Sequence, residues 1–101
     1  MQIYEEEGKL VIQPSGSIRS DNAAEMETEI RKAAAEHPRL PLVIDARGIT
    51  YISSSGLRVL LAIEQTMEDR DGGLTLRHVN ENIIEIFNLV GFMDVVKVEM
   101  D

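Results

Sequence analysis

The sequence contains no cysteine among its 101 residues. This absence excludes a disulfide framework, thiolate metal sites and a cysteine nucleophile, and it fits a reducing cytosol. No uninterrupted apolar run approaches the roughly 18–20 residues that a membrane-spanning helix needs. Glu5, Glu6 and Glu7 stand where a signal peptide would carry basic and then apolar residues. We therefore expect a cytoplasmic protein with no direct membrane insertion.

Basic residues are also scarce, with ten Lys and Arg against eighteen Asp and Glu and a net charge of −8. This balance argues against nucleic acid and anionic membranes as partners and favours a basic patch on a protein. A charge that only keeps the domain soluble fits equally well. Hydrophobic residues make up 44% of the chain, which is enough for one core. We expect a single domain over residues 1–101, present as a monomer.

The motifs of the common enzyme classes are missing. Thr50 and Tyr51 stand where the first glycine of Gly-x-Ser-x-Gly would be needed, so the serines that follow do not form a hydrolase elbow. His37 and His78 are the two histidines, and each is expected in an ordinary surface position. No phosphate-binding loop, dinucleotide fingerprint or metal-ligand spacing occurs. We expect no catalytic residue, no metal and no cofactor.

Short apolar runs alternate with helical patterns along the chain. Tight-turn residues separate the first two runs, which predicts a hairpin, and the later strands alternate with three amphipathic helices. The fold class expected is α/β, a small mixed β-sheet with an opening hairpin and helices packed mainly on one face. The strands are expected at residues 3–4, 10–12, 42–44, 49–52, 74–77 and 95–98. The helices are expected from residue 23 to an end at His37-Pro38, from 56 to 67 and at 83–90.

Polar, glycine and proline residues mark the ends of these elements. Residues 14–16 (Pro-Ser-Gly) predict a break, and residues 20–22 (Ser-Asp-Asn) supply caps for the first helix. Residues 71–73 (Asp-Gly-Gly) end the second helix, and Gly91 ends the third.

Three serines at residues 53–55 precede Gly56 at the expected start of the second helix. One serine, Ser53 or Ser54, suffices as an N-cap, which stabilises a helix by about 1 kcal/mol. Gly56 would let the backbone approach a partner or a phosphate closely. A helix N-terminus also tolerates a phosphate, because its N–H groups are unpaired and its dipole is positive there. The outward-facing serine is therefore a plausible acceptor in a kinase-driven switch.

Residues 42–45 (LVID) followed by 49–61 (ITYISSSGLRVLL) resemble the signature of anti-sigma factor antagonists, which belong to the STAS domain family. That signature is a strand followed by Asp-Ser-Ser/Thr-Gly-Leu at the opening of a helix. Residues 16–23 resemble the family's turn into the first helix, and residues 85–92 resemble its last helix with a glycine stop. The resemblance covers roughly residues 8–99.

The resemblance implies a partner switch. In such systems the unphosphorylated antagonist binds an anti-sigma factor that is itself a serine kinase, phosphorylation breaks the interaction, and a phosphoserine phosphatase restores it. The family's acceptor is the first serine after the motif's aspartate, which corresponds to Ser54. The surface that the resemblance implies for partner binding consists of Arg19, Ser20, Asp21, Ser53, Ser54, Ser55, Gly56, Leu57 and Arg58.

Two residues depart from the family pattern. Ser53 stands in place of the motif's aspartate, and Arg19 stands in place of the acidic residue usual at the end of the second strand. An alternative is therefore a STAS interaction module that is not phosphorylated, such as a cytosolic subunit of a membrane lipid transporter. A small nucleotide-binding protein is a third possibility.

Overall fold

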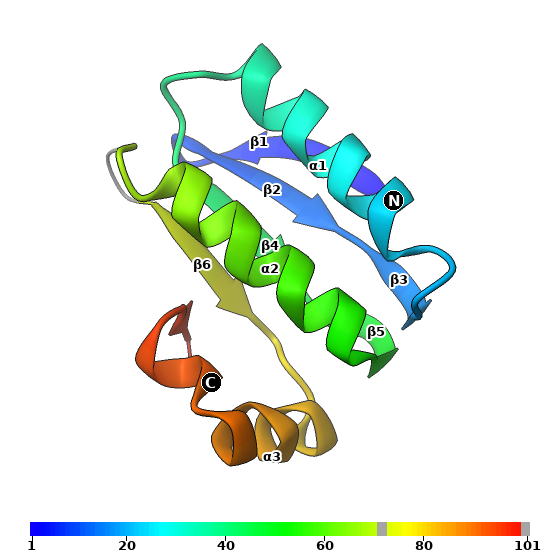
Figure 1. Ribbon diagram of the computed structural model, residues 1–101. Helices are drawn as coiled ribbons and strands as arrows, with labels where there is room; N and C mark the ends of the chain where they lie inside the picture. The colour runs from blue at the N-terminus through cyan, green and yellow to red at the C-terminus, as the bar shows by residue number, and fades with distance from the viewer. Residues whose placement is uncertain (71–72, 100–101) are drawn as a thin grey trace.

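A computed structural model describes residues 1–70 and 73–99 of the chain (Figure 1). The strands are β1 (Gln2–Glu6), β2 (Lys9–Gln13), β3 (Ser15–Ile18), β4 (Leu42–Asp45), β5 (Gly48–Ile52), β6 (Leu74–Arg77) and β7 (Lys97–Val98). The helices are α1 (Ala23–Glu36), α2 (Ser54–Met67), α3 (Glu81–Val90) and the short 3₁₀ helix η1 (Phe92–Asp94).

The main sheet has five strands in the order β1-β2-β4-β6-β7. β1 and β2 form the expected antiparallel hairpin, and the other neighbours are parallel. Glu7 and Gly8 both have positive φ, 50° and 76°, which a two-residue hairpin turn requires so that its twist matches that of the strands. The expected mixed sheet with an opening hairpin is confirmed.

The two long helices, α1 and α2, lie on one face of this sheet, and α3 lies beyond the end of β6 (Figure 1). Alternate residues of the three central strands join the same buried cluster as the helices: Leu10 and Ile12 from β2, Leu42 and Ile44 from β4, Leu74 and Leu76 from β6. The helices contribute Ile30 from α1 and Leu60 and Ile63 from α2. Helices mainly on one face are therefore confirmed.

A two-stranded parallel extension, β3 with β5, continues the chain beyond β2 and β4. Pro14 separates β2 from β3, which agrees with the expected break, because proline has no N–H for the sheet ladder. The break was expected to lead into a turn. β3 is instead a strand that pairs in parallel with β5, with a register shift between Gly16 and Ser17 and with Ile18 opposite Ile52. Its sequence, SGSI, has no apolar alternation, so only the pairing reveals it.

The boundaries of two elements differ clearly from the expected ones. α2 begins at Ser54, two residues before Gly56, because Ser53 takes the cap position. The last strand is confined to Lys97–Val98, since η1 and its turn occupy the residues before it. α2 ends at Met67, as its helical spacing predicted, and of the stop expected at residues 71–73, Asp71 and Gly72 lie outside the described residues. Within the described ranges, no helix is long and apolar enough to cross a membrane.

Candidate functional site at the start of α2

Ser53 is the N-cap of α2. Its backbone is extended, with φ −86° and ψ 171°, and its hydroxyl accepts a hydrogen bond from the N–H of Gly56 at 3.2 Å. The N–H of Ser53 donates to the carbonyl of Ile18 at 2.8 Å, which ties the end of β5 to the end of β3. Ser53 therefore has a structural task that involves both its side chain and its backbone.

Gly56 lies in the first turn of α2, where the helix passes closest to the ends of β3 and β5. A Cβ at this position would lie 2.7 Å from both Ile18 Cγ2 and Ile52 Cγ1, and both isoleucines are buried. The glycine is required by packing, and its φ is not in the left-handed region. The close approach fixes where the first turn of α2 stands on the sheet.

The three serines have different environments. Ser53 and Ser55 are half-buried, whereas Ser54 is exposed as the first residue of α2. Within the described part of the chain, the Ser54 hydroxyl makes no side-chain hydrogen bond. Ser54 thus combines an accessible hydroxyl with the positive end of the helix dipole.

The turn between β3 and α1 forms the other half of this surface. Arg19 donates from Nε to Asp21 Oδ1 at 2.9 Å and from Nη1 to Ser17 Oγ at 3.0 Å, and its side chain is 52% exposed. Ser20 and Asp21 are exposed. Because Ile18 and Ser53 are hydrogen-bonded, this turn lies beside the start of α2.

Side-chain capping of α1 by residues 20–22 was a wrong expectation. Asn22 occupies the N-cap position but makes no side-chain cap hydrogen bond. Its Oδ1 accepts from the N–H of Arg19 at 2.7 Å, and its Nδ2 donates to the carbonyl of Ser17 at 2.9 Å. Asn22 therefore holds the β3–α1 turn instead of the helix.

The structure brings together the two segments that the sequence placed at the candidate site. We call residues 19–21 and 53–58 the Ser54 surface. Leu57 is half-buried and Arg58 is exposed, and both line a groove that runs from Ser54 along α2. Gly56 is buried and serves the surface through packing alone.

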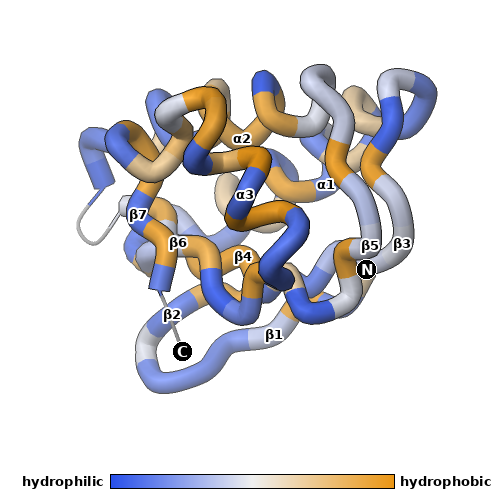
Figure 2. The backbone as a smooth tube through the Cα atoms, turned by 90° about the horizontal axis from the view of Figure 1, so that it is seen from below, coloured by the Kyte–Doolittle hydropathy of each residue, from blue (hydrophilic) through white to orange (hydrophobic). Residues whose placement is uncertain are grey.

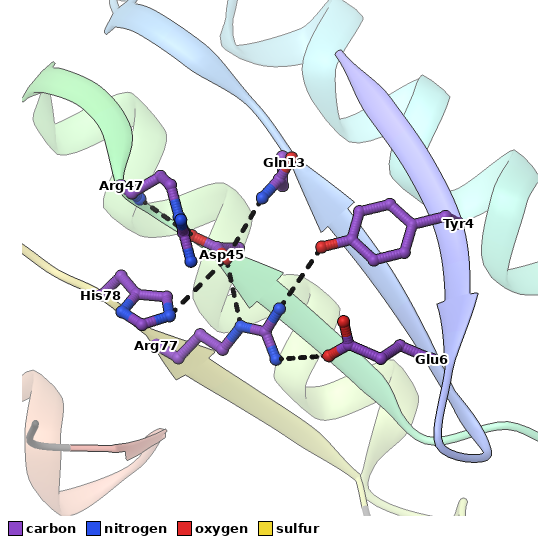
Figure 3. A network of polar contacts seen from close by, with 7 residues as sticks. All are labelled: Tyr4, Glu6, Gln13, Asp45, Arg47, Arg77 and His78. Carbon is purple, nitrogen blue, oxygen red and sulfur yellow. Dashed lines mark hydrogen bonds and ion pairs between the residues drawn. The ribbon is translucent and has the colours of Figure 1, made fainter.

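A second polar cluster, the Asp45 network, was not predicted from the sequence (Figure 3). Asp45 ends β4 and is 0% exposed. Its carboxylate accepts from the backbone N–H of Arg47 at 3.1 Å, from Arg47 Nε at 3.2 Å, from Arg77 Nε at 3.1 Å and from Gln13 Nε2 at 3.2 Å. Arg77 also donates to Glu6 Oε1 at 3.1 Å, which joins β6 to the hairpin.

The hydrogen bonds of this network decide the charge of Asp45. Burial alone would raise the pKa of its carboxyl, but the bonds from Arg47, Gln13 and Arg77 outweigh burial and lower the pKa to about 2. Asp45 is thus ionised at neutral pH, and its hydrogen bonds join three strands. The register could have signalled it, because Gln13, Asp45 and Arg77 occupy neighbouring positions on adjacent strands.

The histidines take no part in the Ser54 surface. His37 is half-buried after the end of α1. His78 is half-buried, has a positive φ of 57°, and lies beside the Asp45 network with Nε2 3.9 Å from Asp45 Oδ2. Among residues 1–70 and 73–99, no group of three or more His, Asp or Glu is arranged to hold a metal ion.

Comparison with known proteins gives the same family from sequence and from structure. The family model described as "Mlab, STAS domain" matches residues 1–98. A protein of Bordetella bronchiseptica named as an anti-sigma factor antagonist, BtrV, is 30% identical over 89 residues, which are 88% of this chain and 76% of that protein.

Two crystal structures have a similar fold. An anti-sigma factor antagonist from Mycobacterium paratuberculosis superimposes with a TM-score of 0.83 at 24% identity, covering 99% of this chain and 84% of the other. A Thermotoga maritima protein named as an anti-sigma factor antagonist superimposes with a TM-score of 0.87 at 15% identity, covering 99% and 86%. This chain belongs to the STAS domain family and, within it, to the anti-sigma factor antagonists, which are regulatory proteins without enzymatic activity.

Proposed function

We propose that this protein binds an anti-sigma factor and is released from it when Ser54 is phosphorylated. The observation that carries the proposal is the different placement of two serines. Ser53 caps α2, and Ser54 is exposed at the first helical position. The family's acceptor position corresponds to Ser54, and the homologue BtrV is named as an anti-sigma factor antagonist.

The physical effect of a phosphate on this surface supports a release step. A phosphate adds a charge of about −1.5 to −2 at neutral pH to a chain that already carries −8. The helix N-terminus tolerates that charge within the protein. A partner surface fitted to a small hydroxyl would instead meet added bulk and a repelling or desolvated charge, so the complex would weaken while the fold remains intact.

Arg19 gives this surface a positive charge at a position where the family usually has an acidic residue. Its guanidinium is held by the exposed carboxylate of Asp21, an ion pair that costs little to open. After phosphorylation it can move to the phosphate and form a charge-assisted pair. In our proposal, Arg19 partly neutralises the charge of the phosphate, while the bulk of the phosphate still blocks the partner.

The implied partners are a serine-kinase anti-sigma factor and a phosphoserine phosphatase, acting on a monomeric antagonist in the cytoplasm. The test incubates the protein with the kinase-type anti-sigma factor of its own genome and ATP, and locates phosphate by mass spectrometry. We expect one phosphate on Ser54, none in Ser54→Ala, and normal phosphorylation in Ser55→Ala. We also expect Ser54→Asp to lose binding. No phosphate on Ser54, together with unchanged binding by Ser54→Asp, would refute the switch.

A second candidate is a STAS interaction module that works without phosphorylation, such as a cytosolic subunit of a membrane lipid transporter. The observation in its favour is the replacement of both expected carboxylates, by Ser53 and Arg19. It predicts that affinity purification at native expression recovers an ATP-binding cassette subunit and no kinase. Recovery of a kinase-type anti-sigma factor, lost in Ser54→Asp, would exclude it.

A further inference from the structure

α2 contains one basic residue, Arg58, which is exposed. Within residues 1–70 and 73–99, its guanidinium makes no hydrogen bond and no ion pair. Four other arginines of the described chain each pair with a carboxylate: Arg19, Arg31, Arg47 and Arg77. The guanidinium of Arg58 therefore has all its donors available to an anion.

Arg58 follows Ser54 by four residues along α2, which is slightly more than one helical turn. Side chains at this spacing are neighbours on the surface of a helix. Ser54, Leu57 and Arg58 all line the groove that runs along α2, so the serine and the arginine face the same side of the helix. A group attached to the Ser54 hydroxyl is therefore within reach of the Arg58 guanidinium.

The order of these two residues along the helix favours an ion pair when Ser54 carries the negative charge. A negative residue four positions before a positive one stabilises a helix more than the reverse order, because the anion also lies near the positive end of the helix dipole. The first turn of α2 contains no acidic residue. A phosphate on Ser54 would therefore be the first anion at this helix end.

Arg19 reaches the same region from the turn that follows β3. Figure 2 shows β3 and β5 side by side, so the mostly hydrophilic turn after β3 and the start of α2 lie at the same end of this pair. Arg19 already donates to Asp21 at 2.9 Å and to Ser17 at 3.0 Å, and these bonds must open before it binds a phosphate. Arg58 gives up no bond, so it is the more favourable partner for the phosphate.

We propose that Arg58 binds the phosphate of phosphorylated Ser54 in a charge-assisted pair along the first two turns of α2. In the phosphorylation step, Ser54 Oγ forms a bond to the γ-phosphorus of ATP, the bond from that phosphorus to the bridging oxygen breaks, ADP leaves, and the hydroxyl proton is released. The phosphate then presents three acceptor oxygens, and the guanidinium donates two parallel hydrogen bonds to them. The backbone need not move, because both residues are already helical.

This inference rests on the proposed function and adds a regulatory role for Arg58. Formation of the pair removes a free cation from the Ser54 surface at the moment when the phosphate adds negative charge. A partner that contacts both the Ser54 hydroxyl and the Arg58 guanidinium therefore loses both contacts in one step. A phosphatase must also open the pair before it hydrolyses the phosphate, so Arg58 slows the return to the unphosphorylated form.

The experiment uses the full chain with phosphoserine incorporated at position 54 during translation, so that no kinase is needed. Phosphorus NMR follows the second ionisation of the phosphate, which occurs near about pH 6 in phosphoserine, in the wild type, Arg58→Gln, Arg58→Lys and Arg19→Gln. The matched control is Arg39→Gln, which removes the same charge from an exposed arginine that follows α1. α1 is about 20 Å long, so salt screens Arg39 from the phosphate.

We expect Arg58→Gln to raise the midpoint of this titration by about half a pH unit, because loss of a neighbouring cation disfavours the doubly charged phosphate. Arg58→Lys keeps the charge but not the two-point geometry and should recover part of that change. Arg19→Gln should have a smaller effect than Arg58→Gln, and Arg39→Gln should change the midpoint by less than about 0.1 pH unit. The Nε–H proton signal of Arg58 should move downfield as the phosphate ionises.

Three results would overturn the inference: equal midpoints for Arg58→Gln and Arg39→Gln, a larger effect of Arg19→Gln than of Arg58→Gln, or an Arg58 Nε–H signal that does not respond to the phosphate. A kinase that leaves Ser54 unmodified would refute the proposed function but would not alter these titrations, because the phosphoserine is incorporated during translation. The two proposals can therefore fail separately.

Discussion

The Asp45 network and the Ser54 surface are both polar clusters at strand ends, yet they differ in how completely their groups are paired. Asp45 is 0% exposed, and its carboxylate is bonded by three side chains and a backbone N–H. The Arg19–Asp21 pair has side chains that are 52% and 71% exposed, and Ser54 is exposed beside it.

The difference indicates which cluster serves the fold and which serves a partner. A buried charge must be fully satisfied, because desolvation without compensation costs several kcal/mol. The buried carboxylate of Asp45 is therefore not available to another molecule. The Ser54 surface has accessible groups with weak internal bonds, so a partner or a phosphate can engage them at little cost to stability.

The largest expected effect is the loss of the Asp45 carboxylate. Asp45→Asn leaves the guanidinium of Arg77, which is only 18% exposed, without its buried counter-charge. We expect the free energy of unfolding to fall by about 3 kcal/mol, measured by urea denaturation. Asp21→Asn is the control from the Ser54 surface and should change stability by less than about 0.5 kcal/mol. Equal effects would abolish the distinction between the clusters.

The pH dependence of stability gives a second test of the difference between the Asp45 network and the Ser54 surface. Asp45 has a folded-state pKa of about 2 against an ordinary value of 3.8, so the unfolded chain binds the proton first. Its stabilisation is therefore complete above about pH 4 to 5 and is lost as the pH falls toward 2, an effect of about 2 kcal/mol.

Urea titrations of the wild type and Asp45→Asn at a series of pH values isolate this contribution. Their difference in unfolding free energy should shrink as the pH falls. A difference that stays constant from pH 5 to pH 2 would show that the Asp45 carboxylate is not held in its charged form.

Gly56→Ala tests the packing beneath the Ser54 surface. The new Cβ would meet two buried isoleucines at 2.7 Å, which outweighs the helix propensity gained from alanine. We expect a net loss of about 1–2 kcal/mol, measured by thermal or urea unfolding. Ser55→Ala, in the same turn, is the control. Unchanged stability of Gly56→Ala would mean that the first turn of α2 is free to shift.

The smallest expected effect is the difference in stability between alanine variants of two neighbouring serines. Ser53→Ala removes the hydroxyl that accepts from Gly56 N–H and should cost about 1 kcal/mol. Ser54→Ala should stay within about 0.5 kcal/mol of the wild type, because its hydroxyl is exposed. Calorimetry of both variants checks the order, and the reverse order would move the cap from Ser53 to Ser54.

Much of the fold could be predicted because apolar periodicity is local information. Residues 42–44 form a short apolar run, and the helical spacing that includes Leu60 and Ile63 marks α2 as a mostly buried helix. β3 escaped prediction because its strand character comes from pairing with β5, which lies about 30 residues away along the chain. The expectation that Asn22 caps α1 was wrong for a related reason. Its side chain bonds to Arg19 and Ser17 within the turn, which a sequence pattern cannot show.

At the candidate site the sequence indicated the serine cluster and Arg19, but not which serine caps α2 and which serine is exposed. That assignment depends on contacts with a distant strand, because the N–H of Ser53 donates to the carbonyl of Ile18 and Gly56 packs against Ile18 and Ile52. The groove was also beyond reach, because it arises where α2 meets the end of α3 and η1.

The sequence by itself determined the α/β class, the order of the elements, the acidic balance and the family signature around residues 53–57, since these depend on residue type and local spacing. Tertiary structure alone decided that Asp45 is buried and paired, that Ser54 rather than Ser53 faces outward, and that an apolar groove begins beside it. The physical reason is that burial and hydrogen-bond pairing are relations between segments distant in the chain, and packing fixes them only when the whole sheet and its helices come together.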